Sequence, residues 1–142
     1  MSGNAVHRQP SACHAAVVLN GCFRHVERLL KVVRGANLVV AADGGGDWLY
    51  AQGYMPHILV GDLDSISSAA LQALEAAGCE VLRFRPDKDE TDAELALLTA
   101  RARGATQIII LGATGGRIDH ELGNVQLLAM SQLRGIHVAI YD

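Results

Sequence analysis

The chain has 142 residues, the length of one domain, and at this size about two-thirds of the unfolded surface can be buried without stabilising disulfides or metals. Half of the residues are hydrophobic and only 4% are aromatic, so we expect an aliphatic core; three cysteines without a CxxC pair indicate neither a disulfide framework nor a zinc site. The net charge of −3, without a Lys/Arg cluster, argues against a nucleic-acid partner, and no apolar run approaches the roughly 18 residues of a membrane span.

The first residues are polar and have no hydrophobic period. Residues 1–12 are therefore predicted to be a disordered tail, and residues 13–142 to form one domain. Arg8 is not followed by the apolar segment of an export signal. Together with the unpaired cysteines, this predicts a protein of the reducing cytoplasm with no membrane partner.

Short β-branched runs then alternate with segments of helical spacing. Six strands are predicted, over Ala15–Leu19, Leu38–Ala42, Ile58–Val60, Glu80–Phe84, Gln107–Leu111 and Ile136–Ile140. Such alternation is typical of βαβ units. It predicts an α/β fold of three layers, Rossmann-like, with a mainly parallel sheet of about six strands and helices on both faces.

Apolar stripes mark the helices between these strands. The stripes are Val26, Leu29, Leu30 and Val33; Leu71 and Leu74; Leu95 and Leu98; and Ile118, Leu122, Val125 and Leu128. We expect glycines to act as C-caps, at Gly35, Gly78, Gly104 and Gly135. The last helix, ending near Gly135, is predicted to be the longest.

Every polar or glycine-rich segment that interrupts the apolar pattern follows a predicted strand. The segments are residues 43–46, 61–65, 86–92 and 112–119. In open parallel sheets, ligands bind beyond the carboxyl ends of the strands. A solvated acidic face would explain the many acids of this region, but carboxylates are also the ligands that Mg²⁺ prefers.

The segment GDLDS places two carboxylates at the end of the third strand. In an extended chain, Asp62 and Asp64 point the same way and repel each other, so a metal ion is one explanation. An Asx-turn in which Ser65 begins the next helix is an equally good one. The segment alone leaves both open.

The segment PDKDETDAELAL, from Pro86 to Leu97, has a structural explanation for part of its length. Thr91 and Glu94 form a capping box, and Asp92 suits the positive end of a helix. Lys88 and Asp89 stay unexplained. A lysine beside several carboxylates can supply positive charge to phosphates while the carboxylates hold a metal.

Two glycine-containing turns complete the edge. The segment Leu111–Asn124 lacks both GxxxxGK[ST] and GxGxxG, yet its glycines allow backbone amides to approach a phosphate. Arg117 and Glu121 have the i, i+4 spacing of a helical ion pair. His120 fits an ordinary surface histidine, and Asn124 fits a solvent-facing position on a helix. In ADGGGDWLYAQG, either Asp43 faces the same cleft as Asp62, or the turn is structural and Trp48 and Tyr50 pack into the core.

Taken together, these motifs resemble those of the thiamin pyrophosphokinase catalytic domain. The resemblance covers about residues 15–141 and is carried by Ala42-Asp43-Gly44-Gly45, Pro56-x-x-Leu59-Val60-Gly61-Asp62-Leu63-Asp64-Ser65, Lys88-Asp89-x-Thr91-Asp92 and Gly112-Ala113-x-Gly115-Gly116-Arg117-x-Asp119-His120. Asn124 and Leu127-Leu128 also fit. Leu63 stands where many members carry Phe. Four motifs in this order are far more specific than any one of them.

The resemblance implies Mg²⁺-dependent transfer of pyrophosphate from ATP to the hydroxyl of thiamin, giving thiamin diphosphate and AMP. It assigns catalysis to Asp62, Asp64, Asp92 and Lys88, with the three aspartates as Mg²⁺ ligands, and nucleotide binding to Asp43, Ser65, Asp89, Thr91, Gly115, Gly116, Arg117 and Asp119. It further implies a homodimer and a C-terminal β-sandwich domain, absent from these residues, that helps to bind thiamin.

Three other functions stay open from the sequence. A pyrophosphokinase for another heterocyclic alcohol, such as a pterin, would need the same inventory of residues. A non-catalytic nucleotide-binding module would need only part of it. A sugar-nucleotide transferase would explain Asp62 and Asp64 but not the segment from Lys88 to Asp92.

Overall fold

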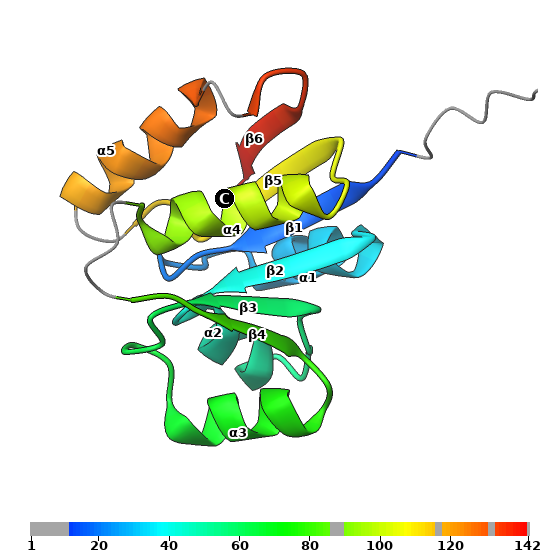
Figure 1. The fold of residues 1–142 in the computed structure, drawn as a ribbon, viewed down its shortest axis with the longest axis vertical. Coiled ribbons are helices and arrows are strands. Elements are labelled where there is room, and N and C mark those ends of the chain that lie inside the picture. The colour runs from blue at the N-terminus through cyan, green and yellow to red at the C-terminus, as the bar shows by residue number, and fades with distance from the viewer. Residues whose placement is uncertain (1–11, 86–89, 116–117, 131–132, 142) are drawn as a thin grey trace, which may run out of the picture.

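A computed structural model describes residues 12–85, 90–115, 118–130 and 133–141, with the backbone alone for 118–121 (Figure 1). The predicted tail therefore lies outside the described residues, apart from Ala12. The strands are β1 (His14–Val18), β2 (Leu38–Ala42), β3 (Ile58–Gly61), β4 (Glu80–Arg83), β5 (Gln107–Leu111) and β6 (His137–Tyr141). The helices are α1 (Val26–Gly35), α2 (Gly45–Ala51), α3 (Ser68–Ala76), α4 (Asp92–Ala102), α5 (Ile118–Gln126) and the 3₁₀ helix η1 (Leu127–Ala129).

The six strands form one parallel sheet in the order β4-β3-β2-β1-β5-β6. The predicted fold class is confirmed, and each strand lies within one residue of its predicted bounds. Prediction of the central strands β1, β2, β3 and β5 succeeds because the sheet is covered on both faces there, so that these strands read as nearly continuous apolar runs. Among the described residues, no helix has the length and apolar character needed to cross a membrane.

Alternate residues of the strands point into two separate apolar layers. On β1, Ala16 and Val18 pack with the layer formed by α1, α2 and α3, whereas Val17 faces α4 on the other side. All three side chains are fully buried. Figure 1 shows α4 crossing in front of the sheet, with α1 and α2 behind it.

The chain changes direction at β1. It runs outward from β1 through β2 and β3 to β4, and then returns across the sheet through α4 to place β5 on the other side of β1. This crossing also puts α4 on the face opposite α1, α2 and α3. The carboxyl ends of the central strands thus form a topological switch point, where open α/β sheets bind their ligands.

The glycine caps are confirmed after two helices and wrong after another. Gly78 and Gly104 have positive φ just beyond α3 and α4. Gly35 is instead the last residue of α1, and the extended Ala36 follows it as the C-cap. Here the helix ends because the chain must straighten into β2.

The prediction of a long last helix is also wrong. Helix α5 has nine residues, fewer than the eleven of α4, and tightens into η1 well before Gly135. The expected apolar stripe does not face the core, since Leu122 is 59% and Val125 47% exposed. The tighter 3₁₀ turn points Leu127 into the core instead, at 4% exposure.

Helix α2 begins unusually close to β1. A Cβ atom at Gly45 would lie 2.2 Å from the carbonyl oxygen of Val18. We therefore expect Gly45→Ala to lower the free energy of unfolding by about 1–3 kcal/mol, because the backbone of a packed core must shift. The midpoint of urea unfolding measures this change.

Gly35→Ala is the matched control, because no atom lies within 4 Å of a Cβ at that position. It should leave the midpoint unchanged or raise it, since alanine is a better helix former than glycine by up to about 1 kcal/mol. Equal midpoints for Gly45→Ala and the unmodified chain would contradict the close approach of α2 to β1.

Candidate active site

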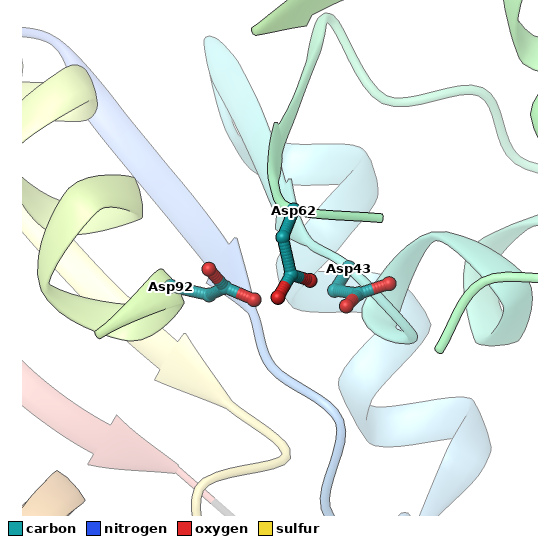
Figure 2. A group of neighbouring side chains, drawn as sticks. All are labelled: Asp43, Asp62 and Asp92. Atoms are coloured by element: carbon teal, nitrogen blue, oxygen red, sulfur yellow. The ribbon is translucent and has the colours of Figure 1, made fainter. Parts of the chain in front are cut away.

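Three carboxylates meet at the carboxyl edge of the sheet (Figure 2). Asp43 follows β2, Asp62 follows β3, and Asp92 is the first residue of α4; one oxygen of each lies within 4.8 Å of the others. Figure 2 shows Asp62 between the other two, with one oxygen of Asp92 directed toward it and the carboxylate of Asp43 on its other side. Charges this close repel each other, and a hard cation with oxygen ligands, such as Mg²⁺, is the compensation that suits this donor set.

Asp92 reaches this point because of two local features. Thr91 caps α4, its Oγ1 accepting a hydrogen bond from the backbone N–H of Glu94 at 3.1 Å, so the predicted cap is confirmed. Gly61 leaves room for the carboxylate, since a Cβ atom there would lie 2.9 Å from Oδ2 of Asp92. A side chain at the end of β3 would therefore force the carboxylate of Asp92 to move.

Asp43 is the buried member of the group, with 5% of its surface exposed. Its carboxylate accepts hydrogen bonds from the backbone N–H groups of Ser65, at 3.1 and 3.2 Å, and of Ile66, at 2.8 Å. Burial raises the pKa of Asp43 to about 7, and the neighbouring carboxyls of Asp64 and Asp62 add to this rise, while the two backbone donors oppose it. Below about pH 7 a proton is therefore retained at Asp43. The hydrogen bond to Asp43 lowers the pKa of the exposed Asp64.

Asp62 and Asp64 do not lie in an extended strand. Leu63, between them, has a left-handed backbone with φ of 64°. Asp64 donates its N–H to Oδ1 of Asp62 at 3.2 Å, which is the Asx-turn considered from the sequence. Helix α3 begins later than that interpretation supposed, because its N-cap is Ser67 and not Ser65. The turn and the acidic site are thus one structure.

These carboxylates line a pocket of about 850 Å³, within the size range of small-molecule sites. The sequence-predicted residues Asp64, Ser65 and Thr91 contribute to it. Other lining residues were not among the predicted site residues: Leu19, Asn20, Gly21, Ala42, Ala93, Glu94, Gly112, Ala113, Gly123, Asn124, Gln126, Leu127 and Met130. Asn20 is the second residue after β1, so the rule that ligand residues follow strands would have found it.

The loop after β5 is held from two sides. Cys22 donates its N–H to the carbonyl of Thr114 at 3.0 Å and its thiol to the carbonyl of Gly115 at 2.7 Å. Asn124 donates its side-chain amide to the carbonyl of Ala113 at 3.0 Å and is half-buried. The expectation of a solvent-facing Asn124 is therefore wrong, because its amide ties α5 to this loop.

Some of the predicted site residues lie outside the part of the chain that the structure describes. Lys88, Asp89, Gly116 and Arg117 are not among the described residues, nor are the side chains of Asp119, His120 and Glu121. In the turn after β2, Trp48 is half-buried and stacks on Phe23, with ring centroids 4.1 Å apart. Tyr50 is 39% exposed, so its placement in the core is wrong.

An all-parallel α/β domain with three converging carboxylates beside a pocket has the features of a domain that binds a metal-complexed phosphate compound. The family model described as the thiamin pyrophosphokinase catalytic domain matches residues 29–140. The chain belongs to this family.

Relatives with known names agree with this assignment. The thiamine pyrophosphokinase of Bacillus subtilis is 36% identical over 105 residues, covering 74% of this chain and 49% of that protein. Thiamine pyrophosphokinase 1 of Oryza sativa is 32% identical, covering 83% of this chain and 52% of that protein. The chain thus spans about half the length of the curated relatives it matches.

Solved structures give the same result for the fold. The crystal structure of Bacillus subtilis thiamine pyrophosphokinase superposes with a TM-score of 0.74 at 31% identity, covering 91% of this chain and 60% of that one. Yeast thiamin pyrophosphokinase gives 0.78 at 17% identity, covering 96% and 60%, a likeness of fold alone.

The raised pKa of Asp43 predicts a pH dependence of stability in the absence of metal. Between about pH 4 and pH 7 the folded chain holds a proton at Asp43 that the unfolded chain has released, so stability should fall as the pH rises through this window. Asp64 acts in the opposite sense: its contribution is present above the ordinary carboxyl pKa and is lost as the pH falls below that range.

Thermal unfolding with a chelator at pH 5, 6 and 7 measures this trend. Asp43→Asn should flatten it, because the amide does not titrate, and Mg²⁺ should reduce it by favouring the ionised form of Asp43. Equal slopes for Asp43→Asn and the unmodified chain would contradict the assignment of the proton to Asp43.

Proposed function

We propose that this chain is the catalytic part of an enzyme that transfers the pyrophosphoryl group of ATP to thiamin. In this reaction the hydroxyl oxygen of thiamin forms a bond to the β-phosphorus, the bond from that phosphorus to the α-phosphate oxygen breaks, AMP leaves, and the hydroxyl proton is released. The observation that carries the proposal is the convergence of Asp43, Asp62 and Asp92 within 4.8 Å, in a chain that matches the family over residues 29–140.

The metal that suits this site is Mg²⁺. Asp62 and Asp92 would hold it. The resemblance assigns Asp64 as the third ligand, and the carboxylate that lies within 4.8 Å of both Asp62 and Asp92 is that of Asp43. Bound there, the cation would neutralise phosphate charge and hold the transferred group in place. Asp64 lines the same pocket as Asp43, but its side chain is exposed whereas that of Asp43 is buried.

The remaining nucleotide contacts are proposed from the sequence pattern. Lys88 and Arg117 would bring positive charge to the phosphates, which the acidic cluster alone cannot bind. The other proposed nucleotide contacts are Ser65, Asp89, Thr91, Gly115, Gly116 and Asp119. Ser65 and Thr91 support this proposal through their places in the pocket wall.

The proposal extends to the assembly and its place in the cell. We propose a homodimer in which a further, β-rich domain completes the thiamin site, as the family resemblance implies. We also propose a cytoplasmic location, supported by the free thiols of Cys13, Cys22 and Cys79.

Isotope-labelled ATP tests the reaction. With the protein encoded by the complete reading frame, Mg²⁺ and thiamin, we expect AMP and thiamin diphosphate in equal amounts, with the label of the β- and γ-phosphates in thiamin diphosphate. Chromatography of the products measures both.

Two other outcomes would contradict the proposal. Formation of ADP and thiamin monophosphate would show transfer of the γ-phosphate alone. Formation of AMP only with another heterocyclic alcohol, such as a hydroxymethylpterin, would assign a different acceptor, and Mg·ATP binding without any AMP would indicate a nucleotide-binding module.

The role of Asp62 can be separated from that of its turn. We expect Asp62→Ala to lower kcat by at least about 100-fold, since it removes a ligand at the centre of the site. The free energy of unfolding should change by no more than about 1 kcal/mol, because the lost hydrogen bond to Asp64 is exposed and one of three repelling charges is gone. Glu27→Ala, on the exposed face of α1, is a control that should change neither quantity. Loss of folding in Asp62→Ala would favour a purely structural turn.

A further inference from the structure

Asp47 makes a contact that the proposed reaction does not use. It lies in the first turn of α2, and both oxygens of its carboxylate accept hydrogen bonds from one residue, Ser67. Oδ2 accepts the backbone N–H at 2.8 Å and Oδ1 accepts the hydroxyl at 2.6 Å. The Ser67 hydroxyl also accepts the N–H of Ala70 at 3.2 Å, so the residue that caps α3 is at the same time attached to α2.

The segment between β3 and Ser67 carries Asp62 and Asp64, and it is held at both ends. Its start continues from β3, which pairs with β2. Its middle is held by Asp43, which accepts the N–H groups of Ser65 and Ile66, and its end is held by Asp47. Asp43 and Asp47 are four residues apart, so the turn that enters α2 and the first turn of α2 hold the middle and the end of this loop.

The charge of Asp47 suits this position. A carboxylate accepts stronger hydrogen bonds than a neutral oxygen, and negative charge is favourable at a helix N-terminus. Asp47 lies in the first turn of α2 and beside the N-cap of α3, so a single charge serves both helices. An asparagine could accept only through its one oxygen and would lack the charge.

Asp47 does not itself belong to the metal site. Within the described part of the chain, it is outside the group formed by Asp43, Asp62 and Asp92, and it is not among the residues that line the pocket. We infer that Asp47 is a positioning residue: through Ser67 it fixes the loop that presents Asp62 and Asp64 to the metal and its phosphates. The consequence for catalysis rests on the proposed function, whereas the consequence for metal binding does not.

Direct metal binding tests the inference with Mn²⁺ as the probe. In the 142-residue chain, Asp47→Ala should weaken Mn²⁺ binding, followed by electron paramagnetic resonance, by about tenfold, as is typical when a partner outside the ligand set is removed. In the complete protein, the Mg²⁺ concentration for half-maximal rate should rise by a similar factor, with the KM for thiamin unchanged.

Conservative variants identify the contact that matters. Asp47→Asn should recover part of the loss, because its amide oxygen can accept one of the two hydrogen bonds. Ser67→Thr should bind Mn²⁺ normally, whereas Ser67→Ala, which loses the hydroxyl, should weaken binding. The double variant Asp47→Ala with Ser67→Ala should be no weaker than Asp47→Ala alone, because both act through one contact.

Glu75→Gln is the matched control. It removes the same charge from α3, where Glu75 pairs with Arg83 at 3.4 Å on the surface, and it should leave Mn²⁺ binding unchanged. Circular dichroism identifies any variant that fails to fold, in which case Asp47→Asn and Ser67→Ala carry the test.

The outcomes separate the inference from the proposed function. If Asp47→Ala lowers the Tm but changes Mn²⁺ binding by less than twofold, Asp47 has only a structural role and the inference is overturned. Failure of the unmodified chain to bind Mn²⁺ would also overturn it. If Asp47→Ala weakens Mn²⁺ binding tenfold but the complete protein forms no thiamin diphosphate, the proposed function fails and the inference stands.

Discussion

The buried carboxylate of Asp43 is the contact on which the acidic edge depends. It accepts the backbone N–H groups of Ser65 and Ile66, and so holds the loop after β3 against the end of β2. The same carboxylate lies within 4.8 Å of those of Asp62 and Asp92, where its charge is costly. One group thus stabilises the loop and creates the repulsion that a cation relieves. This explains why burial and neighbouring acids raise its pKa to about 7 in the absence of metal.

The order of the strands decides which residues can meet Asp43. Because β2 and β3 are parallel neighbours, the residues that follow them emerge side by side, and Asp62 needs no long side chain to reach Asp43. Asp92 arrives differently, from the N-terminus of the helix that crosses back over the sheet. The site therefore combines two strand ends with one helix start, and Gly61 supplies the space where they meet.

Much of this could be predicted from local patterns, and the failures have physical causes. The central strands and the cap at Thr91 were predictable because burial on both faces and a capping hydroxyl leave local signals. The stripe of Leu122 and Val125 misled because apolar spacing shows an apolar face without showing what covers it. The contact of Asp47 with Ser67 spans 20 positions between two helices, and no pattern within either helix encodes it.

The two non-glycine residues with positive φ in the described chain both belong to this edge: Asp43 at 41° and Leu63 at 64°. A left-handed backbone costs such residues of order 1–3 kcal/mol each, so the surroundings must impose it. At Leu63 the side chain is 9% exposed and packs in the layer of α1, α2 and α3, and burying a leucine contributes about 1.5–3 kcal/mol. Burial of Leu63 thereby offsets the strain of the turn that separates Asp62 from Asp64. The acidic site therefore depends on an apolar residue at this position. Its burial holds Asp62 and Asp64 in a turn, where an extended backbone would place them differently.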